Sequence, residues 1–348
     1  MIKREYLKPG SIAAVGLTMF LLIAGSGALS GQSFDIPSKR WGISFGNSKK
    51  FTGLRFNFRD SQVQRICGIN VTLWQPRKDN QEAVVQGLSL GVIPGGGYLR
   101  GIQVGFLGVA AEKDLWGISL GGLGAGSGGD VTGLNIGGLG TGAGGSMTGL
   151  NLGGLGTGAG DNLIGINIGG FGAGAGKNMK GLNIGGLGVG AGEDVAGISF
   201  GGFGAGAGHD MTGINIGGLG VGAGRRMVGL NIGGIGAGAG EKLVGLTIGG
   251  IGAGAPEVQG LTIGGIGVGG EVLKGIHLAL GTIMVTDNGR MVGFAASAVN
   301  YIKGTQVGLS IGIVNYAWSL KGVQIGLVNI VRDNPKGRKV LPFLNANF

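Results

Sequence analysis

The chain has little of what catalytic and metal-binding sites are usually built from. Its 348 residues include one cysteine and two histidines, and charged residues make up only 13% of the sequence. A single cysteine excludes an internal disulfide. His209 and His277 belong to no HExxH motif, and no acidic pair is placed as a general acid and base on one face. We therefore expect no enzymatic activity, no catalytic residue, no metal and no cofactor.

Aromatic residues are also scarce, at 6%, and they are not interleaved with the basic residues. We therefore expect no nucleic-acid partner. The net charge of +10 comes from the two ends of the chain. Lys and Arg outnumber Asp and Glu by 11 to 6 in residues 31–116 and by 8 to 3 in residues 260–348, whereas residues 117–259 hold 5 against 7. Such basic ends suit an anionic envelope polysaccharide or lipopolysaccharide.

Glycine is abundant instead, with 88 residues, and it follows a repeat. Near-identical 16-residue units begin at Gly117, Gly133, Gly149, Gly165, Gly181, Gly197, Gly213, Gly229 and Gly245, and shorter steps reach Gly260 and Gly275. The hydrophobic content of 43% argues against disorder, and glycine is not every third residue, which excludes collagen. A fixed period of this length indicates a repeat architecture.

The unit predicts two strands and two corners. With the first glycine of each unit as position 1, Leu or Ile at positions 2 and 4 alternates with a polar residue at position 3, which is the period of a strand. A Gly-Gly pair at positions 5 and 6 shifts the phase, and a second strand follows. The variable, charged positions 13 and 14 form a solvated turn. We expect the Leu and Ile columns to supply the buried core.

Two stackings suit such a unit. In a β-solenoid each unit is one coil, and equivalent residues lie above one another. In an outer-membrane antiparallel β-barrel, successive strands would reverse direction, and the alternating ending VLPFLNANF resembles a terminal barrel strand. The apolar face switches at each Gly-Gly pair, which does not suit a lipid-facing strand. We therefore predict an all-β solenoid with atypical capping repeats, and keep the barrel or pore as the alternative.

Position 3 is the candidate site of the repeat. Its residues share a short polar side chain, and they are Asn135, Asn151, Asn167, Asn183, Ser199, Asn215, Asn231 and Thr247. In a solenoid, stacked amides can hydrogen-bond to one another as a ladder. Two other interpretations stay open: asparagine as the outward polar residue of a half-buried strand, or a column that binds ice or carbohydrate.

The rest of the chain divides around this array. Residues 1–30 combine Lys3, Arg4 and Lys8 with an apolar run, which is typical of a signal peptide; an uncleaved anchor is the alternative. Residues 31–116 hold degenerate units at Gly42, Gly53, Gly68, Gly87 and Gly101, residues 117–274 form the regular array, and residues 275–348 are degenerate repeats and a cap.

The C-terminal repeats GLSIGIVNYA, from Gly308, and GVQIGLVN, from Gly322, resemble bacterial exported surface-repeat proteins, known from the leptospiral surface-repeat group. The resemblance implies an exported, envelope-associated protein, at the cell surface, in the periplasm or at the outer membrane. No cysteine stands directly after the signal peptide, so we do not expect the lipid anchor of lipoprotein members. We expect a non-enzymatic structural or adhesive surface protein.

Overall fold

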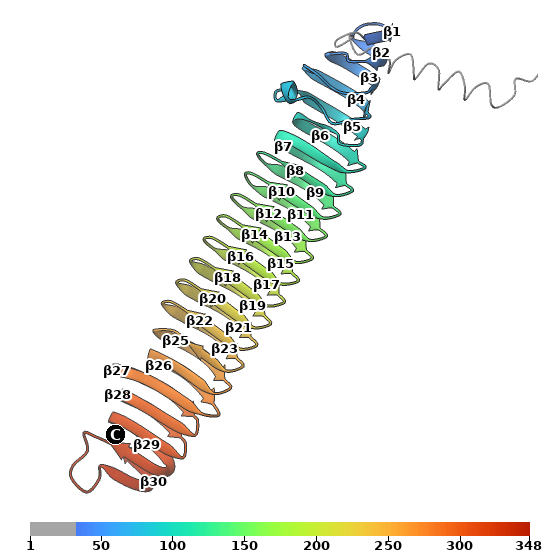
Figure 1. Ribbon diagram of the computed structural model, residues 1–348. Coiled ribbons are helices and arrows are strands. Elements are labelled where there is room, and N and C mark those ends of the chain that lie inside the picture. The colour runs from blue at the N-terminus through green and yellow to red at the C-terminus, as the bar shows by residue number, and fades with distance from the viewer. Residues whose placement is uncertain (1–32) are drawn as a thin grey trace, which may run out of the picture.

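The protein is a long stack of β-strands with its two ends far apart. A computed structural model describes residues 33–348, and the predicted signal peptide, residues 1–30, lies outside them. Figure 1 shows a single rod with the first strand at one end and the last at the other. Within the described part of the chain, the one helix is η1 at Lys78–Asn80, a 3-10 helix. No helix there is long and apolar enough to cross a membrane.

The elements fall into three stretches along the rod. The N-terminal strands are β1 Ser33–Pro37, β2 Trp41–Gly46, β3 Lys50–Asn57, β4 Arg65–Thr72, β5 Val84–Gly91, β6 Gly95–Gly105 and β7 Gly108–Gly121. The C-terminal strands are β26 Gly267–Ala279, β27 Thr282–Ala296, β28 Val299–Ile311, β29 Val314–Val331 and β30 Val340–Asn347.

In the array between them, each coil has one long and one short strand. The long strands are β9 Val131–Gly137, β11 Met147–Gly153, β13 Leu163–Gly169, β15 Met179–Gly185, β17 Val195–Gly201, β19 Asp210–Gly217, β21 Arg226–Gly233, β23 Lys242–Gly249 and β25 Glu257–Gly264. The short strands are β8 Gly124–Ser127, β10 Gly140–Ala143, β12 Gly156–Ala159, β14 Gly172–Ala175, β16 Gly188–Ala191, β18 Gly204–Ala207, β20 Gly220–Ala223, β22 Gly236–Ala239 and β24 Gly252–Gly254.

The β-solenoid is confirmed. Each array strand pairs in parallel with its counterpart one repeat away, so that Asn151 lies between Asn135 and Asn167. The same register links position 1 of the degenerate units, from Gly42 to Gly101 and from Gly275 to Gly322, so both ends are coils of the same solenoid. The antiparallel barrel is wrong for the described residues, because successive coils keep one strand direction.

Both ends of the rod are closed by a reversed strand. β1 pairs antiparallel with β2, and β30 pairs antiparallel with β29. The ending that resembles a barrel strand is therefore the C-terminal cap. Reversed caps of this kind stop a parallel stack from growing by addition of further strands in the same direction.

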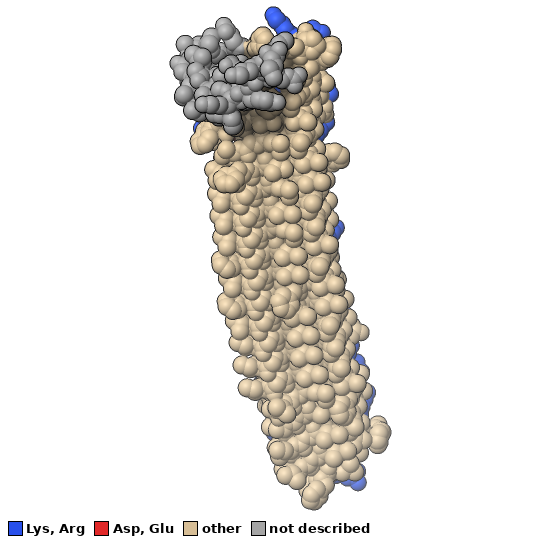
Figure 2. Space-filling view, turned by 90° about the vertical axis from the view of Figure 1, so that its right-hand side faces the viewer, with Lys and Arg blue, Asp and Glu red and all other residues tan. Residues whose placement is uncertain are grey.

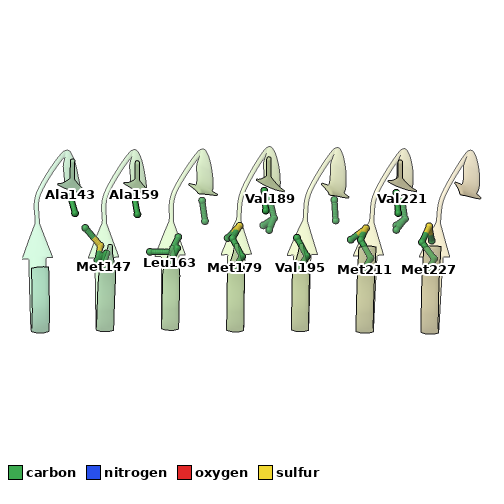
Figure 3. Close-up of a cluster of buried hydrophobic side chains, with 14 of the residues drawn as sticks. Ala143, Met147, Ala159, Leu163, Met179, Val189, Val195, Met211, Val221 and Met227 are labelled. Atoms are coloured by element: carbon green, nitrogen blue, oxygen red, sulfur yellow. The ribbon is translucent and has the colours of Figure 1, made fainter. Parts of the chain in front are cut away.

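The apolar core lies between the long and short strands. Position 15 of the repeat lies at the start of each long strand. Its residues form a buried column of Met, Leu and Val, including Met147, Leu163 and Met179, all 0% exposed. Figure 3 shows these side chains pointing toward Ala and Val of the short strands, such as Ala143 and Val189. A fully buried side chain of this size stabilises the fold by roughly 1.5–3 kcal/mol.

Two glycine columns allow this close stacking. Position 1 has a φ between +108° and +124° in the array, and a Cβ on Gly149 would lie 2.1 Å from the carbonyl oxygen of Gly133. At position 6, a Cβ on Gly138 would lie 1.9 Å from the carbonyl oxygen of Gly122. Only glycine fits both places, because a side chain would collide with the backbone of the preceding coil.

Candidate functional site

The position-3 column lies inside the solenoid. Its eight predicted members, from Asn135 to Thr247, are each at most 1% exposed. The Nδ2 of Asn135 donates to the Oδ1 of Asn151 at 2.9 Å. Asn151 donates in the same way to Asn167 at 2.8 Å, and Asn167 to Asn183 at 2.9 Å. The amides thus supply the hydrogen bonds that buried polar groups need.

The ladder has two interruptions. At Ser199 the side chain is too short to bridge, and Asn183 Nδ2, Ser199 Oγ and Asn215 Oδ1 have no hydrogen-bond partner. The ladder resumes with a 2.9 Å bond from Asn215 to Asn231 and stops again before Thr247, where Asn231 Nδ2 has no partner. A shielded column cannot present its amides to ice or to a carbohydrate, so the ice- or carbohydrate-binding alternative is wrong.

The polar column is longer than the array. In register with Asn135, it continues towards the N-terminus through Ser119, Gln103, Ser89, Asn70, Arg55 and Ser44, and beyond Thr247 through Thr262 and His277. Sequence reasoning missed these members because their side chains differ. Their common signal is a polar residue two places after the position-1 glycine, between two apolar residues.

The N-terminal part of this column holds a buried ionic cluster. The guanidinium of Arg55 lies 2.6 Å from the Asp60 carboxylate, with side-chain exposures of 0% and 3%. Arg55 also donates to the Oδ1 of Asn70 at 2.8 Å. Asp60 further accepts from Asn57 at 2.8 Å and from the Thr72 hydroxyl at 3.1 Å. These hydrogen bonds compensate the buried pair, and only Arg55 Nε in the cluster has no partner among the described residues.

His277 is the least satisfied member of the column. It is 0% exposed, and neither ring nitrogen has a hydrogen-bond partner. Burial lowers the pKa of His277 to about 4, because the interior disfavours the charged imidazolium.

A second amide ladder runs inside the last coils. The Nδ2 of Asn300 donates to the Oδ1 of Asn315 at 2.7 Å, and the Nδ2 of Asn315 donates to the Oδ1 of Asn329 at 2.8 Å.

The Leu and Ile columns at positions 2 and 4 face outward, so their expected role as the core is wrong. Because positions 3 and 5 are buried, the residues between them project from the opposite face of the strand. Ile166 and Ile198 at position 2 are 42% and 46% exposed. The corner column at position 7 is also exposed, for example Leu139 at 50% and Phe171 at 59%. The interior therefore holds the polar position-3 column as well as the apolar position-15 core, and part of the surface is also apolar.

Charge in the array is concentrated at the predicted corner, where neighbouring coils neutralise one another. Lys177 pairs with Asp161 at 2.7 Å across one coil step. The guanidinium of Arg226, 2.7 Å from Asp210, holds the pKa of that carboxyl below its ordinary value. Such exposed pairs contribute about 0–1 kcal/mol each.

Within residues 33–348, no group of three His, Cys, Asp or Glu side chains is placed to hold a metal ion. The features left to explain are the buried polar column and the outward apolar columns.

Comparison with known protein families, curated proteins and solved structures gave no match.

Proposed function

We propose that the protein is a non-enzymatic structural or adhesive element of a bacterial envelope, exported and held as a rod of fixed length. The observation that carries the proposal is the pair of reversed caps, β1 on β2 and β30 on β29. A parallel stack capped at both ends has a defined length, whereas an open stack would grow into a fibre. A spacer or surface display element needs such a defined length.

Three sequence features support this role. Residues 1–30 have the pattern of a signal peptide, and the repeats from Gly308 and Gly322 resemble exported surface-repeat proteins. The excess of Lys and Arg in residues 31–116 and 260–348 supports an anionic envelope partner, polysaccharide or lipopolysaccharide.

Surface location and export test the proposal together. The full chain, carrying a C-terminal tag, is expressed in a Gram-negative host, and intact cells are treated with protease before fractionation. We expect the protein in the envelope fraction and shortened on intact cells. A version with Lys3, Arg4 and Lys8 changed to Glu controls for export through residues 1–30. If the unmodified protein stays in the cytoplasm and is fully protected from the protease in intact cells, the proposal is contradicted.

A further inference from the structure

One side of the solenoid is an unpartnered apolar sheet face. This apolar side consists of the outward columns at positions 16, 2 and 4. Position 2 is Ile, Leu, Phe or Val in every coil from Ile43 to Val323, and position 4 is apolar from Phe45 to Ile325. Phe45 stacks on Phe56 in that column, with ring centroids 5.5 Å apart. The face therefore runs along the whole rod.

The apolar side of the array reaches the upper end of what a soluble monomer normally exposes. Ten coils begin between Gly117 and Gly260. At about 4.8 Å per coil and about 13 Å for the five residues from position 16 to position 4, they present about 600 Å². The degenerate coils at both ends extend the face further. The largest exposed apolar patches on monomers are about 300–600 Å² and commonly mark a binding surface.

Within these three columns the charges all have one sign, and carboxylates begin at the neighbouring position 14, where Asp114 and Asp130 line one hollow with Arg100. Positions 16, 2 and 4 contain no Asp or Glu in any coil, whereas position 16 carries Arg100, Lys180, Lys274 and Lys321, all exposed. Lys274 is paired with Glu257 at the neighbouring corner, and the other three make no ion pair within residues 33–348. Figure 2 shows one long face of the rod, on which no acidic side chain is visible and basic side chains lie at the upper end and mainly along the right-hand edge.

Exposed tryptophans occupy the same column as these cations. Trp41 and Trp116 are at position 16, with 59% and 58% of their surface exposed. Tryptophan at the rim of an apolar surface, beside Lys and Arg whose stems can lie on hydrocarbon, is the combination found where proteins meet the headgroup region of a membrane.

We infer that the apolar side lies on an anionic phospholipid bilayer, with positions 2 and 4 in contact with acyl chains and position 16 at the headgroups. Charge complementarity decides between this occupant and a second copy of the chain. A second copy would bring a second position-16 column in which three of the four cations make no ion pair within the described residues, whereas anionic headgroups neutralise them. The inference gives the proposed envelope rod its means of attachment, but lipid binding is measured independently of export.

Vesicle flotation with the full chain tests the inference. The variant Ile198→Asp/Ile214→Asp places two carboxylates on the apolar side, at residues that are 46% and 37% exposed. The control Ser146→Asp/His209→Asp places two carboxylates at the solvated corner. We expect the unmodified chain to bind vesicles of equal parts phosphatidylglycerol and phosphatidylcholine. The apolar-side variant should bind at least about tenfold more weakly, and the control within about twofold.

A second variant avoids any effect on packing. Lys180→Glu/Lys321→Glu changes two exposed side chains of position 16 and should also lower binding by at least about tenfold, with the loss confined to vesicles that contain phosphatidylglycerol. Circular dichroism confirms that each variant folds. If neither variant weakens binding, or if the unmodified chain does not bind the vesicles, the inference is overturned. Sedimentation of a dimer that Ile198→Asp/Ile214→Asp dissociates would assign the apolar side to a second copy instead.

A local probe separates this side from residues 1–30, which all variants share. Cys67, the single cysteine of the chain, lies at position 16, so a polarity-sensitive fluorophore can be attached there. Phosphatidylglycerol vesicles should shift its emission to the blue. The same fluorophore on Cys67→Ser/Ser146→Cys, at the corner, should not respond. A bound chain in which the Cys67 label stays in water would also overturn the inference.

Discussion

The guanidinium of Arg55 and the carboxylate of Asp60 are 2.6 Å apart inside the N-terminal coils, and both side chains are almost fully shielded from solvent. Arg55 takes the place that asparagine takes in the array, two residues after a position-1 glycine. The polar column thus accepts a full charge where a counter-charge is close.

Asp60→Asn should destabilise the protein by about 3–5 kcal/mol, because Arg55 would keep its charge in the interior without a counter-charge. The matched control is Glu82→Gln, which breaks the exposed pair between Glu82 and Lys113 and should cost less than about 1 kcal/mol. Urea denaturation of both variants measures the difference. Equal losses would show that the Arg55 cluster is not buried.

His277 should make the protein less stable in mild acid. Its folded pKa is about 4, below the ordinary value of 6.5, so the unfolded chain binds the proton first as the pH falls. The stability associated with a neutral His277 is therefore complete above pH 6.5 and is lost as the pH falls towards 4, by up to about 3 kcal/mol.

The control for this pH dependence is His277→Thr, since Thr262 occupies the preceding place in the same column. Thermal melting from pH 7 to pH 4.5 should show a smaller decrease for the variant than for the unmodified chain. Identical pH profiles would mean that His277 titrates normally and is not held in the interior.

Replacing either of two glycines of one repeat with alanine should change the stability of the protein in opposite directions. A Cβ on Gly142 would lie 3.9 Å from the nearest atom, the carbonyl oxygen of Gly158, and Gly142 has no left-handed φ. Gly142→Ala should therefore stabilise the protein by about 0.4–1 kcal/mol through the unfolded chain. Gly138→Ala should be clearly destabilising, because its Cβ would lie 1.9 Å from the oxygen of Gly122. The two urea midpoints check the glycine assignment; midpoints that shift in the same direction would refute it.

The architecture could be predicted from the sequence because the repeat period directly gives the register. Units that match at every sixteenth residue place Asn151 beside Asn135 and Asn167 in any solenoid. The degenerate coils were also recognisable, since Gly42 and Gly322 keep the position-1 glycine that the backbone requires there.

Which face of the long strand is buried could not be predicted from the repeat. A period of two shows that Leu150 and Asn151 point to opposite faces, but it does not show which face is buried. General hydrophobicity favours a leucine interior, and that expectation was wrong. Asn151 is buried because copies of the same amide one coil above and below supply its hydrogen bonds, which a single strand does not reveal. Arg55 and His277 keep only the general signal of a polar residue two places after the position-1 glycine, and that signal does not show that they are buried.

The stability of Ser199→Asn tests the central claim, an interior ladder of stacked amides, most directly. In the unmodified chain the ladder stops between Asn183 and Asn215, whose facing Nδ2 and Oδ1 have no partner. An asparagine at residue 199 would lie between Asn183 and Asn215, just as Asn167 lies between two asparagines, and could hydrogen-bond to both. We predict that Ser199→Asn raises the free energy of unfolding by about 1–3 kcal/mol in urea. An unchanged or lower value would contradict the ladder and the inward orientation of the column.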